Sequence, residues 1–219
     1  MGLRTVRQRF RRCFTEWGRP ERLRVDNGWP WGSAGDLPPD LALWLIGLGI
    51  DIMWNPPRSP QDNGVVERSQ GVAKNWAEPD QCRTAAHLQR RLNREDHIQR
   101  AQYPSIQGIP RMTAFPELLH TGRPYSWSWE SQHWDFARVC AELSGYAVGR
   151  RVDCCGKIGV YHHKLYVGVR HQGQAVYLQL DPDRREWIVT DRAGHQLHRT
   201  PAEIITPSRI RNLTVSRDH

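Results

Sequence analysis

The sequence has few lysines, few cysteines and no long apolar run, and each shortage excludes a class of protein. Only three of its 31 Lys and Arg residues are lysine. The five cysteines are scattered and include no C-x-x-C pair, so neither a disulfide framework nor a zinc site is expected. The longest mostly apolar stretch, 41–50, is about half of the roughly 20 residues that a bilayer span needs, which excludes a transmembrane anchor. Since residues 1–25 contain no apolar signal-peptide core, we expect a cytoplasmic protein without a membrane partner.

The charge is strongly basic and is carried almost entirely by arginine. The chain of 219 residues has a formal net charge of +8, and residues 1–25 hold eight Arg against two Glu. The planar guanidinium group suits phosphate oxygens, so this composition favours a polyanionic partner such as nucleic acid. Arginine enrichment from genomic codon usage is the alternative interpretation.

The first hundred residues follow the pattern of an α/β fold. Val6, Phe10, Phe14 and Trp17 form an apolar stripe of helical period, which predicts an amphipathic helix over 6–17. A short strand is expected at 23–25, and a helix over 40–48, with Asp40 as its N-cap, precedes a second strand at 50–54. Strand, helix and strand in this order indicate an α/β sheet.

The rest of the chain changes from helical to β character. Helices are predicted over 65–76 and 81–101, and residues 104–144 are expected to form a connector with a short helix at 113–120. Short runs of aromatic and β-branched residues then predict five strands of a small barrel, at 151–160, 165–171, 175–180, 187–191 and 196–198. The expected division is an α/β core with a helical extension over 1–103, the connector over 104–144 and the barrel over 145–219.

Two carboxylates stand out as candidate metal ligands. Asp26 ends the predicted strand in the string RVDNG, where a carboxylate would lie at the open edge of an α/β sheet, although Asp-Asn-Gly is also ordinary turn chemistry. Glu67 falls in the first turn of the predicted helix that follows a Pro- and Gly-rich loop. Lys74 lies seven residues later, about two turns, and therefore on the same face. Carboxylate oxygens are the ligands that Mg²⁺ prefers.

These strings resemble a known family. Gly18 and Pro20 before RVDNG, followed by NPPRSPQDNGVVERSQGVAK over 55–74, are similar to motifs in the catalytic core of retroviral-integrase-like DDE transposases of bacterial insertion sequences. The resemblance covers about residues 3–76. It implies a partial RNase H-like core, and the β-rich segment after about residue 145 resembles the small all-β SH3-like barrel behind the core of many such transposases.

The resemblance also implies a site and partners. Asp26 and Glu67 match the second and third members of the family's metal-binding triad, which uses Mg²⁺ or Mn²⁺ and no small-molecule cofactor. The side chains expected to lie against DNA are those of Lys74, Gln61 and Asn63. Members of the family usually work as multimers, so a homo-oligomer or a full-length transposase is an expected partner besides DNA.

The resemblance begins after the family's first strand, which bears the first catalytic Asp. Two-metal phosphoryl transfer on DNA needs about three carboxylates, so this chain is expected to be inactive alone. The strand at 23–25 would also be an exposed sheet edge, which favours association. The alternatives are a non-catalytic DNA-binding fragment that modulates a full-length transposase, and a decayed remnant that does not fold stably.

Three further features have two interpretations each. Trp29 and Trp31, near Asp26, are the best candidates among the ten tryptophans for stacking on unpaired bases, while packing is the commoner role of tryptophan. The arginines over 90–100 favour a solvated helix face. A phosphate-binding surface is the second interpretation. His162 and His163 with the cysteines at 154–155 are adjacent pairs, whose geometry does not suit a tetrahedral metal site.

Overall fold

A computed structural model describes residues 2–33, 35–56 and 64–213. The protein is of mixed α/β class and divides into two compact units. The first unit comprises Met1–Thr15, Arg19–Pro57 and Tyr125–His219, and the second comprises Glu16–Gly18 and Arg58–Pro124. Across the described residues, no helix combines the length and the apolar character that a membrane crossing requires.

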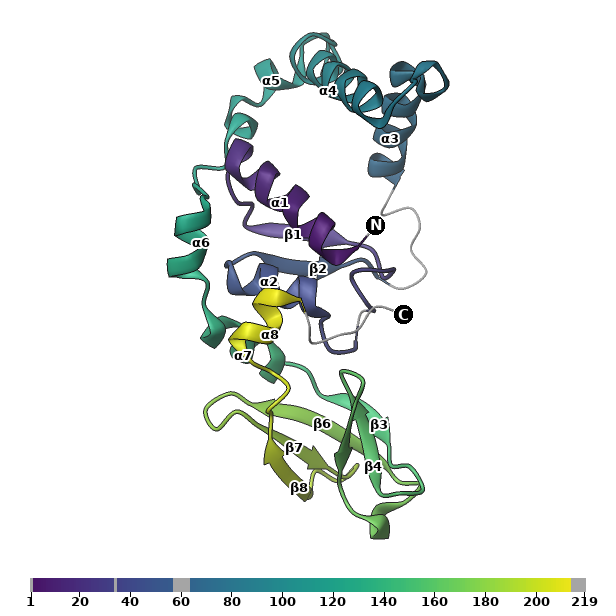
Figure 1. Cartoon of the computed structure of the whole chain (residues 1–219), viewed down its shortest axis with the longest axis vertical. Coiled ribbons are helices and arrows are strands. Elements are labelled where there is room, and N and C mark those ends of the chain that lie inside the picture. The colour runs from purple at the N-terminus through teal and green to yellow at the C-terminus, as the bar shows by residue number, and fades with distance from the viewer. Residues whose placement is uncertain (1, 34, 57–63, 214–219) are drawn as a thin grey trace. The chain divides into compact units, whose positions relative to one another are not determined.

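Figure 1 shows the elements in chain order. The α-helices are α1 Leu3–Trp17, α2 Asp40–Gly47, α3 Gly64–Ala77, α4 Ala85–Ala101, α5 Arg111–Ala114, α6 Trp127–His133, α7 Phe136–Ser144 and α8 Pro207–Asn212. The 3₁₀ helices are η2 Pro79–Gln81, η3 Pro116–Leu119 and η4 Val169–His171. The strands are β1 Arg22–Val25, β2 Asp51–Trp54, β3 Val148–Arg151, β4 Lys157–Val160, β5 His163–Tyr166, β6 Ala175–Asp181, β7 Glu186–Thr190 and β8 Gln196–Pro201.

The predicted strand, helix and strand are confirmed as a parallel unit, β1-α2-β2. β1 pairs with β2 from Arg22 opposite Asp51 to Val25 opposite Trp54. All eight residues of α2 are buried, and the helix ends before Gly49, whose φ of +71° is readily adopted by glycine. The prediction that Asp40 is the N-cap of this helix is wrong. Pro39 occupies the cap with extended backbone, and Asp40 is a buried residue of the first turn, where the helix dipole favours a carboxylate.

A buried carboxylate connects three helices of the first unit. Glu130 on α6 accepts hydrogen bonds from the guanidinium group of Arg11 on α1 and from the indole N–H of Trp44 on α2, the latter at 3.0 Å. The hydroxyl of Tyr125 donates a further hydrogen bond to Glu130. Aromatic packing reinforces the same contact, because Phe14 of α1 stacks on Trp44 at 6.4 Å. The predicted amphipathic helix is therefore confirmed, and Val6, Phe10 and Phe14 of its apolar stripe pack in the core of the first unit.

The β-rich segment forms an antiparallel sheet of order β3-β6-β7-β8 and a separate hairpin, β4-β5. The prediction of one strand over 151–160 is wrong. The carboxylate of Asp153 accepts the backbone N–H groups of Cys155 at 3.0 Å and Lys157 at 2.9 Å, which closes a turn. Gly156 continues this turn with a φ of +73°, so β3 ends at Arg151 and β4 starts at Lys157. Among the described residues the hydrogen-bonded sheet has two open ends, β3 and β8.

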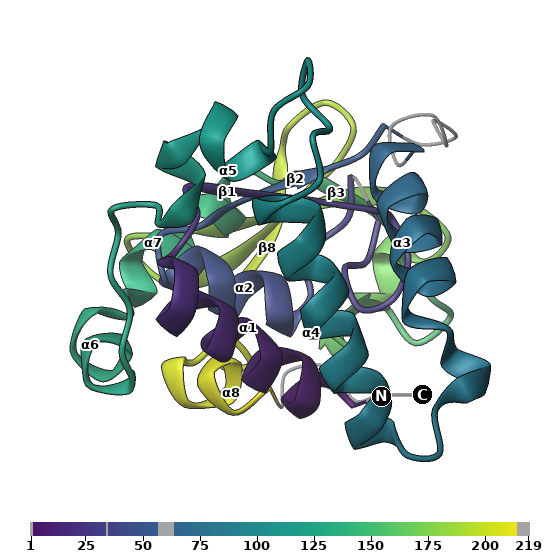
Figure 2. The ribbon, with the colours of Figure 1, turned by 90° about the horizontal axis from the view of Figure 1, so that it is seen from above.

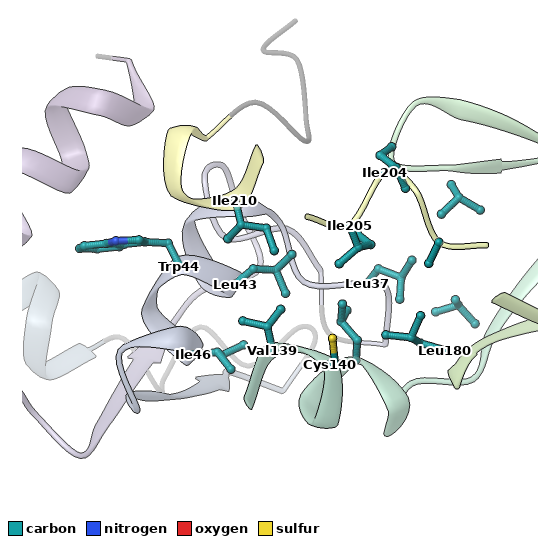
Figure 3. Close-up of a cluster of buried hydrophobic side chains, with 14 of the residues drawn as sticks. Leu37, Leu43, Trp44, Ile46, Val139, Cys140, Leu180, Ile204, Ile205 and Ile210 are labelled. Atoms are coloured by element: carbon teal, nitrogen blue, oxygen red, sulfur yellow. The ribbon is translucent and has the colours of Figure 1, made fainter. Parts of the chain in front are cut away.

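The core of the first unit is one hydrophobic cluster that spans both its helices and its sheet. Figure 3 shows Leu43 of α2, Val139 of α7 and Ile210 of α8 converging, with Leu180 of β6 farther along the cluster. The cluster explains why these segments fold as one compact unit although they lie far apart in the chain. The predicted domain boundaries after residues 103 and 144 remain a prediction. The two compact units are divided at other positions along the chain.

The second unit is a helical hairpin in which α3 packs beside α4 (Figure 2). The predicted helix over 65–76 is confirmed as α3. The helix predicted from 81 begins later, because Pro79–Gln81 forms a 3₁₀ turn and the hydroxyl of Thr84 caps α4 by accepting the N–H of His87 at 3.1 Å. No residue of α4 is buried, and a contact between Trp76 and Tyr103 at 5.5 Å supports the hairpin.

Candidate metal and nucleic-acid site

Asp26 lies at the carboxyl end of the parallel strand pair. It follows Val25, the buried last residue of β1, and its own side chain is exposed. In open α/β sheets, ligands bind outside the carboxyl ends of the strands. The Oδ1 atom of Asp26 accepts the N–H of Gly28 at 3.2 Å, which turns the chain sharply after the strand. The turn and the exposed carboxylate therefore coexist, and the two interpretations of this residue do not exclude each other.

Asn55 holds this end of the sheet in place. It follows β2, it is 4% exposed, and its N–H donates to the carbonyl of Val25 at 2.8 Å. The side-chain oxygen of Asn55 accepts the Nε of Arg24 at 2.7 Å, and its carbonyl accepts the side-chain N–H of Asn27 at 2.8 Å. Sequence reasoning missed this residue. The sequence did contain an indication of its role, because Asn55 directly follows the predicted strand at 50–54 and begins the second motif string.

Glu67 and Lys74 lie on α3 in the second unit. Both side chains are exposed, Glu67 in the first turn of the helix and Lys74 in its last turn. A separation of seven residues places them on one face, about 10 Å apart along the axis. The helix dipole stabilises an acidic group at the first turn and a basic group at the last, so both positions also have a purely structural explanation. The predicted DNA contacts Gln61 and Asn63 lie outside the described residues.

The two candidate metal ligands belong to different compact units, Asp26 to the first and Glu67 to the second. Their exposed carboxylates are donors of the type that Mg²⁺ and Mn²⁺ prefer. Two carboxylates are too few ligands for a complete metal site. The described part of the chain contains no group of three or more His, Cys, Asp or Glu side chains that could hold a metal ion. The residues fit the metal in chemistry, and a complete site requires further ligands.

The two tryptophans after Asp26 have different environments. Trp31 packs edge-on against Phe10 at 5.8 Å, and its carbonyl accepts the indole N–H of Trp54 at 2.9 Å. Trp29 is 61% exposed. The turn that carries Trp29 is closed by a hydrogen bond of 2.8 Å from the N–H of Trp31 to the carbonyl of Gly28. Of these two tryptophans, Trp29 is the one with a largely exposed ring, three residues after Asp26 in the chain.

Several arginines of the opening segment serve the fold instead of forming an open basic surface. Arg11 pairs with the buried Glu130 at 2.6 Å. Arg19 is buried, its guanidinium group lies 3.5 Å from the ring centroid of Trp129, and it donates to the carbonyl of Leu48. The basic surface of α1 is thus smaller than its charge suggests. Its exposed arginines are Arg4, Arg9 and Arg12.

The predicted solvated face of α4 is partly neutralised by acidic partners. Arg91 pairs with Glu78, and Arg100 pairs with Asp96 at 3.2 Å. Arg90 and Arg94 remain exposed. This pattern is typical of a solvated helix and gives little support to a continuous phosphate-binding surface.

No protein-family model matches this chain.

Proposed function

We propose that this chain is part of a DDE transposase or integrase that cleaves and joins DNA strands, with Asp26 and Glu67 as two of its metal ligands. The position of Asp26 carries the proposal. It is an exposed carboxylate directly after a buried parallel strand, at the end of the sheet held by Asn55. In this proposal β1-α2-β2 belongs to a partial RNase H-like core, and the sheet β3-β6-β7-β8 with the hairpin β4-β5 forms the SH3-like barrel.

The residues of the chain have distinct roles in this proposal. A bound Mg²⁺ or Mn²⁺ would stabilise the charge that develops on the phosphate and activate the attacking oxygen. Asp26 and Glu67 would hold the ion through carboxylate oxygens. Lys74 would neutralise a backbone phosphate from the face of α3 that it shares with Glu67. Trp29 would provide a stacking surface for an unpaired base beside the site.

Affinity cleavage tests whether Asp26 and Glu67 share an ion. Fe²⁺ replaces Mg²⁺ at oxygen-donor sites and, with ascorbate and peroxide, generates hydroxyl radicals that cut the nearby polypeptide backbone. The proposal predicts cuts near residue 26 and near residue 67, and loss of both sets in Asp26→Asn. Glu78→Gln is the control, since Glu78 is an exposed carboxylate in the same unit as Glu67 and pairs with Arg91. Cuts near residue 67 that persist in Asp26→Asn would contradict a shared ion.

A non-catalytic DNA-binding role is the second candidate. The exposed Arg4, Arg9 and Arg12 on α1 favour it, because they present positive charge on one element without acidic partners among the described ion pairs. DNA binding by these groups must weaken steeply as salt rises, because bound phosphates release counterions. Fluorescence anisotropy of a labelled duplex across a salt series measures this dependence, and a flat response would contradict the idea.

A further inference from the structure

Cys154 and Cys155 form a pair of exposed thiols in the turn between β3 and β4. Their sulfur atoms lie 3.9 Å apart. The other three cysteines differ, since Cys13 and Cys82 are partly buried and Cys140 is buried. We call Cys154 and Cys155 the dithiol. It lies outside the candidate metal and nucleic-acid site described above.

Both carboxylate oxygens of Asp153 stabilise the turn that carries the dithiol. The Oδ1 atom of Asp153 accepts the N–H groups of Cys155 and Lys157, and its Oδ2 atom accepts the ammonium of Lys164 at 3.0 Å. These hydrogen bonds, first that from Lys157, hold the pKa of Asp153 below its ordinary value. Gly156 is required in this turn, because its φ is +73° and a Cβ there would lie 2.5 Å from the nitrogen of Val169. The backbone that carries the two sulfurs is therefore held by specific hydrogen bonds.

The separation of the sulfurs decides what they can bind. A disulfide needs about 2.05 Å between sulfurs and usually at least about 4.4 Å between Cα atoms, whereas adjacent Cα atoms are about 3.8 Å apart. Two sulfurs bound to one tetrahedral ion at about 2.3 Å lie about 3.8 Å from each other. The observed 3.9 Å fits two of the four positions around such an ion, although the adjacent Cys and His pairs together do not supply a full tetrahedral set. Joining the sulfurs directly would strain the turn, while bridging them through a single centre would not.

The hairpin β4-β5 keeps the histidines away from the dithiol. Val160 pairs with His163 at one end, and Lys157 pairs with Tyr166 at the other, next to the dithiol. Four residues of strand span about 13 Å, so His162 and His163 are out of reach of the same centre. Asp153 is already occupied by three donors. Within the described ranges, the turn thus supplies two sulfur ligands.

We propose that the dithiol is a two-sulfur chelating site for a thiophilic centre, either a trivalent arsenical or a d¹⁰ metal ion. A monosubstituted trivalent arsenical needs only two sulfurs, so the turn satisfies it completely. A d¹⁰ ion such as Cd²⁺ takes additional ligands from solvent. With phenylarsine oxide, two As–S bonds form, the As–O bond breaks, and the oxygen leaves as water with both thiol protons, without any oxidation.

The experiment treats the full reduced chain with phenylarsine oxide alone and, in a separate arm, with Cd²⁺ alone. Intact-protein mass spectrometry reports the arsenical adduct, and ultraviolet thiolate-to-metal absorption reports Cd²⁺. We expect one arsenical per chain, with affinity falling roughly 100-fold or more in Cys154→Ser and in Cys155→Ser because the second bond is intramolecular. Cys82→Ser should leave the affinity unchanged. A Cd²⁺ absorption band that is lost in either serine variant would show that the dithiol also binds a d¹⁰ metal ion. If no such band forms, the site binds arsenicals alone.

A second measurement uses only the unsubstituted protein. The arsenical adduct should resist excess 2-mercaptoethanol and be reversed by a small vicinal dithiol, because only another chelator competes with two linked sulfurs. Release by the monothiol, uptake of neither probe, or an adduct that survives in both serine variants would each overturn the proposal. Matching circular dichroism spectra of the variants confirm that the fold is intact.

Discussion

Arg11 of α1 and Glu130 of α6, which are 119 positions apart in the chain, form a largely buried ion pair. Arg11 donates through Nε at 2.9 Å and through Nη2 at 2.6 Å to the two carboxylate oxygens. The side chain of Glu130 is 3% exposed and that of Arg11 is 17% exposed, so solvent screens the pair weakly. This two-point contact joins α1 to α6, and through Trp44 it also reaches α2.

Removing the charge of Glu130 should destabilise the first unit. Glu130→Gln leaves the guanidinium group of Arg11 in a largely buried position without a counter-charge, which costs about 3 kcal/mol. Urea unfolding followed by circular dichroism measures the free energy of unfolding. The double variant Arg11→Leu with Glu130→Leu should recover part of the loss, because no charge is left unpaired, while the donors of Trp44 and Tyr125 lose their acceptor. A double variant no more stable than Glu130→Gln would contradict this explanation.

The stability contributed by Glu130 should depend on pH. Burial alone raises its pKa, but hydrogen bonds from Arg11, Tyr125 and Trp44 outweigh burial, and the pKa lies below its ordinary value. A lowered pKa stabilises the fold above the unfolded-state value of about 4.3, and this stabilisation is lost as pH falls through the folded-state pKa. The difference in unfolding free energy between the natural chain and Glu130→Gln should therefore shrink from about pH 7 to about pH 3. A constant difference would show that Glu130 is not ionised in the folded state.

Trp29 should contribute to binding of DNA that contains unpaired bases. Trp29→Ala is expected to weaken binding of a duplex with a single-stranded end roughly tenfold, since stacking of a base on an aromatic ring contributes about 1–3 kcal/mol. Binding of a fully paired duplex should change little. Trp127→Ala is the control, because Trp127 is 64% exposed but lies against the guanidinium group of Arg11. Equal losses in both variants would mean that the position of Trp29 confers no preference.

Two glycine substitutions should act in opposite directions. A Cβ at Gly47 of α2 would lie 2.2 Å from Nε1 of Trp134, so Gly47→Ala must displace this ring and should cost about 1–3 kcal/mol. A Cβ at Gly71 of α3 would meet no atom within 4 Å, so Gly71→Ala should stabilise its helix by about 0.5–1 kcal/mol. Thermal unfolding of the two variants measures both effects. A stabilised Gly47→Ala variant would show that the ring moves freely.

The 219-residue chain should not cleave DNA without additional ligands. Phosphoryl transfer with two metal ions needs about three carboxylates, and the proposed site has two in Asp26 and Glu67. We expect no nicking of supercoiled plasmid with Mg²⁺ or Mn²⁺. Nicking that disappears in Glu67→Gln would contradict this expectation and would show that the chain assembles a complete site.

The helical stripe of 6–17, the strands on either side of α2, and the helices over 64–77 and 85–101 could be predicted because local periodicity and turn residues specify them. The exposed Asp26 at the end of β1 followed from the same pattern. The turn at Asp153 could not be predicted in this way. The residues on both sides of this turn have high strand propensity. The Asp153 carboxylate accepts hydrogen bonds from two backbone N–H groups, and these bonds favour a turn over a continuous strand.

The sequence by itself determined the helices and strands of the first hundred residues and the presence of a carboxylate at the end of β1, because these depend on neighbours within a few residues. It did not determine helices α6, α7 and α8. Only the tertiary structure decided that Arg11 pairs with Glu130, that Trp31 packs while Trp29 stays open, and that Asn55 holds the end of the sheet. The role of a charged or aromatic side chain depends on what distant segments place beside it. Those contacts arise from packing of the whole unit around α2, which local periodicity does not encode.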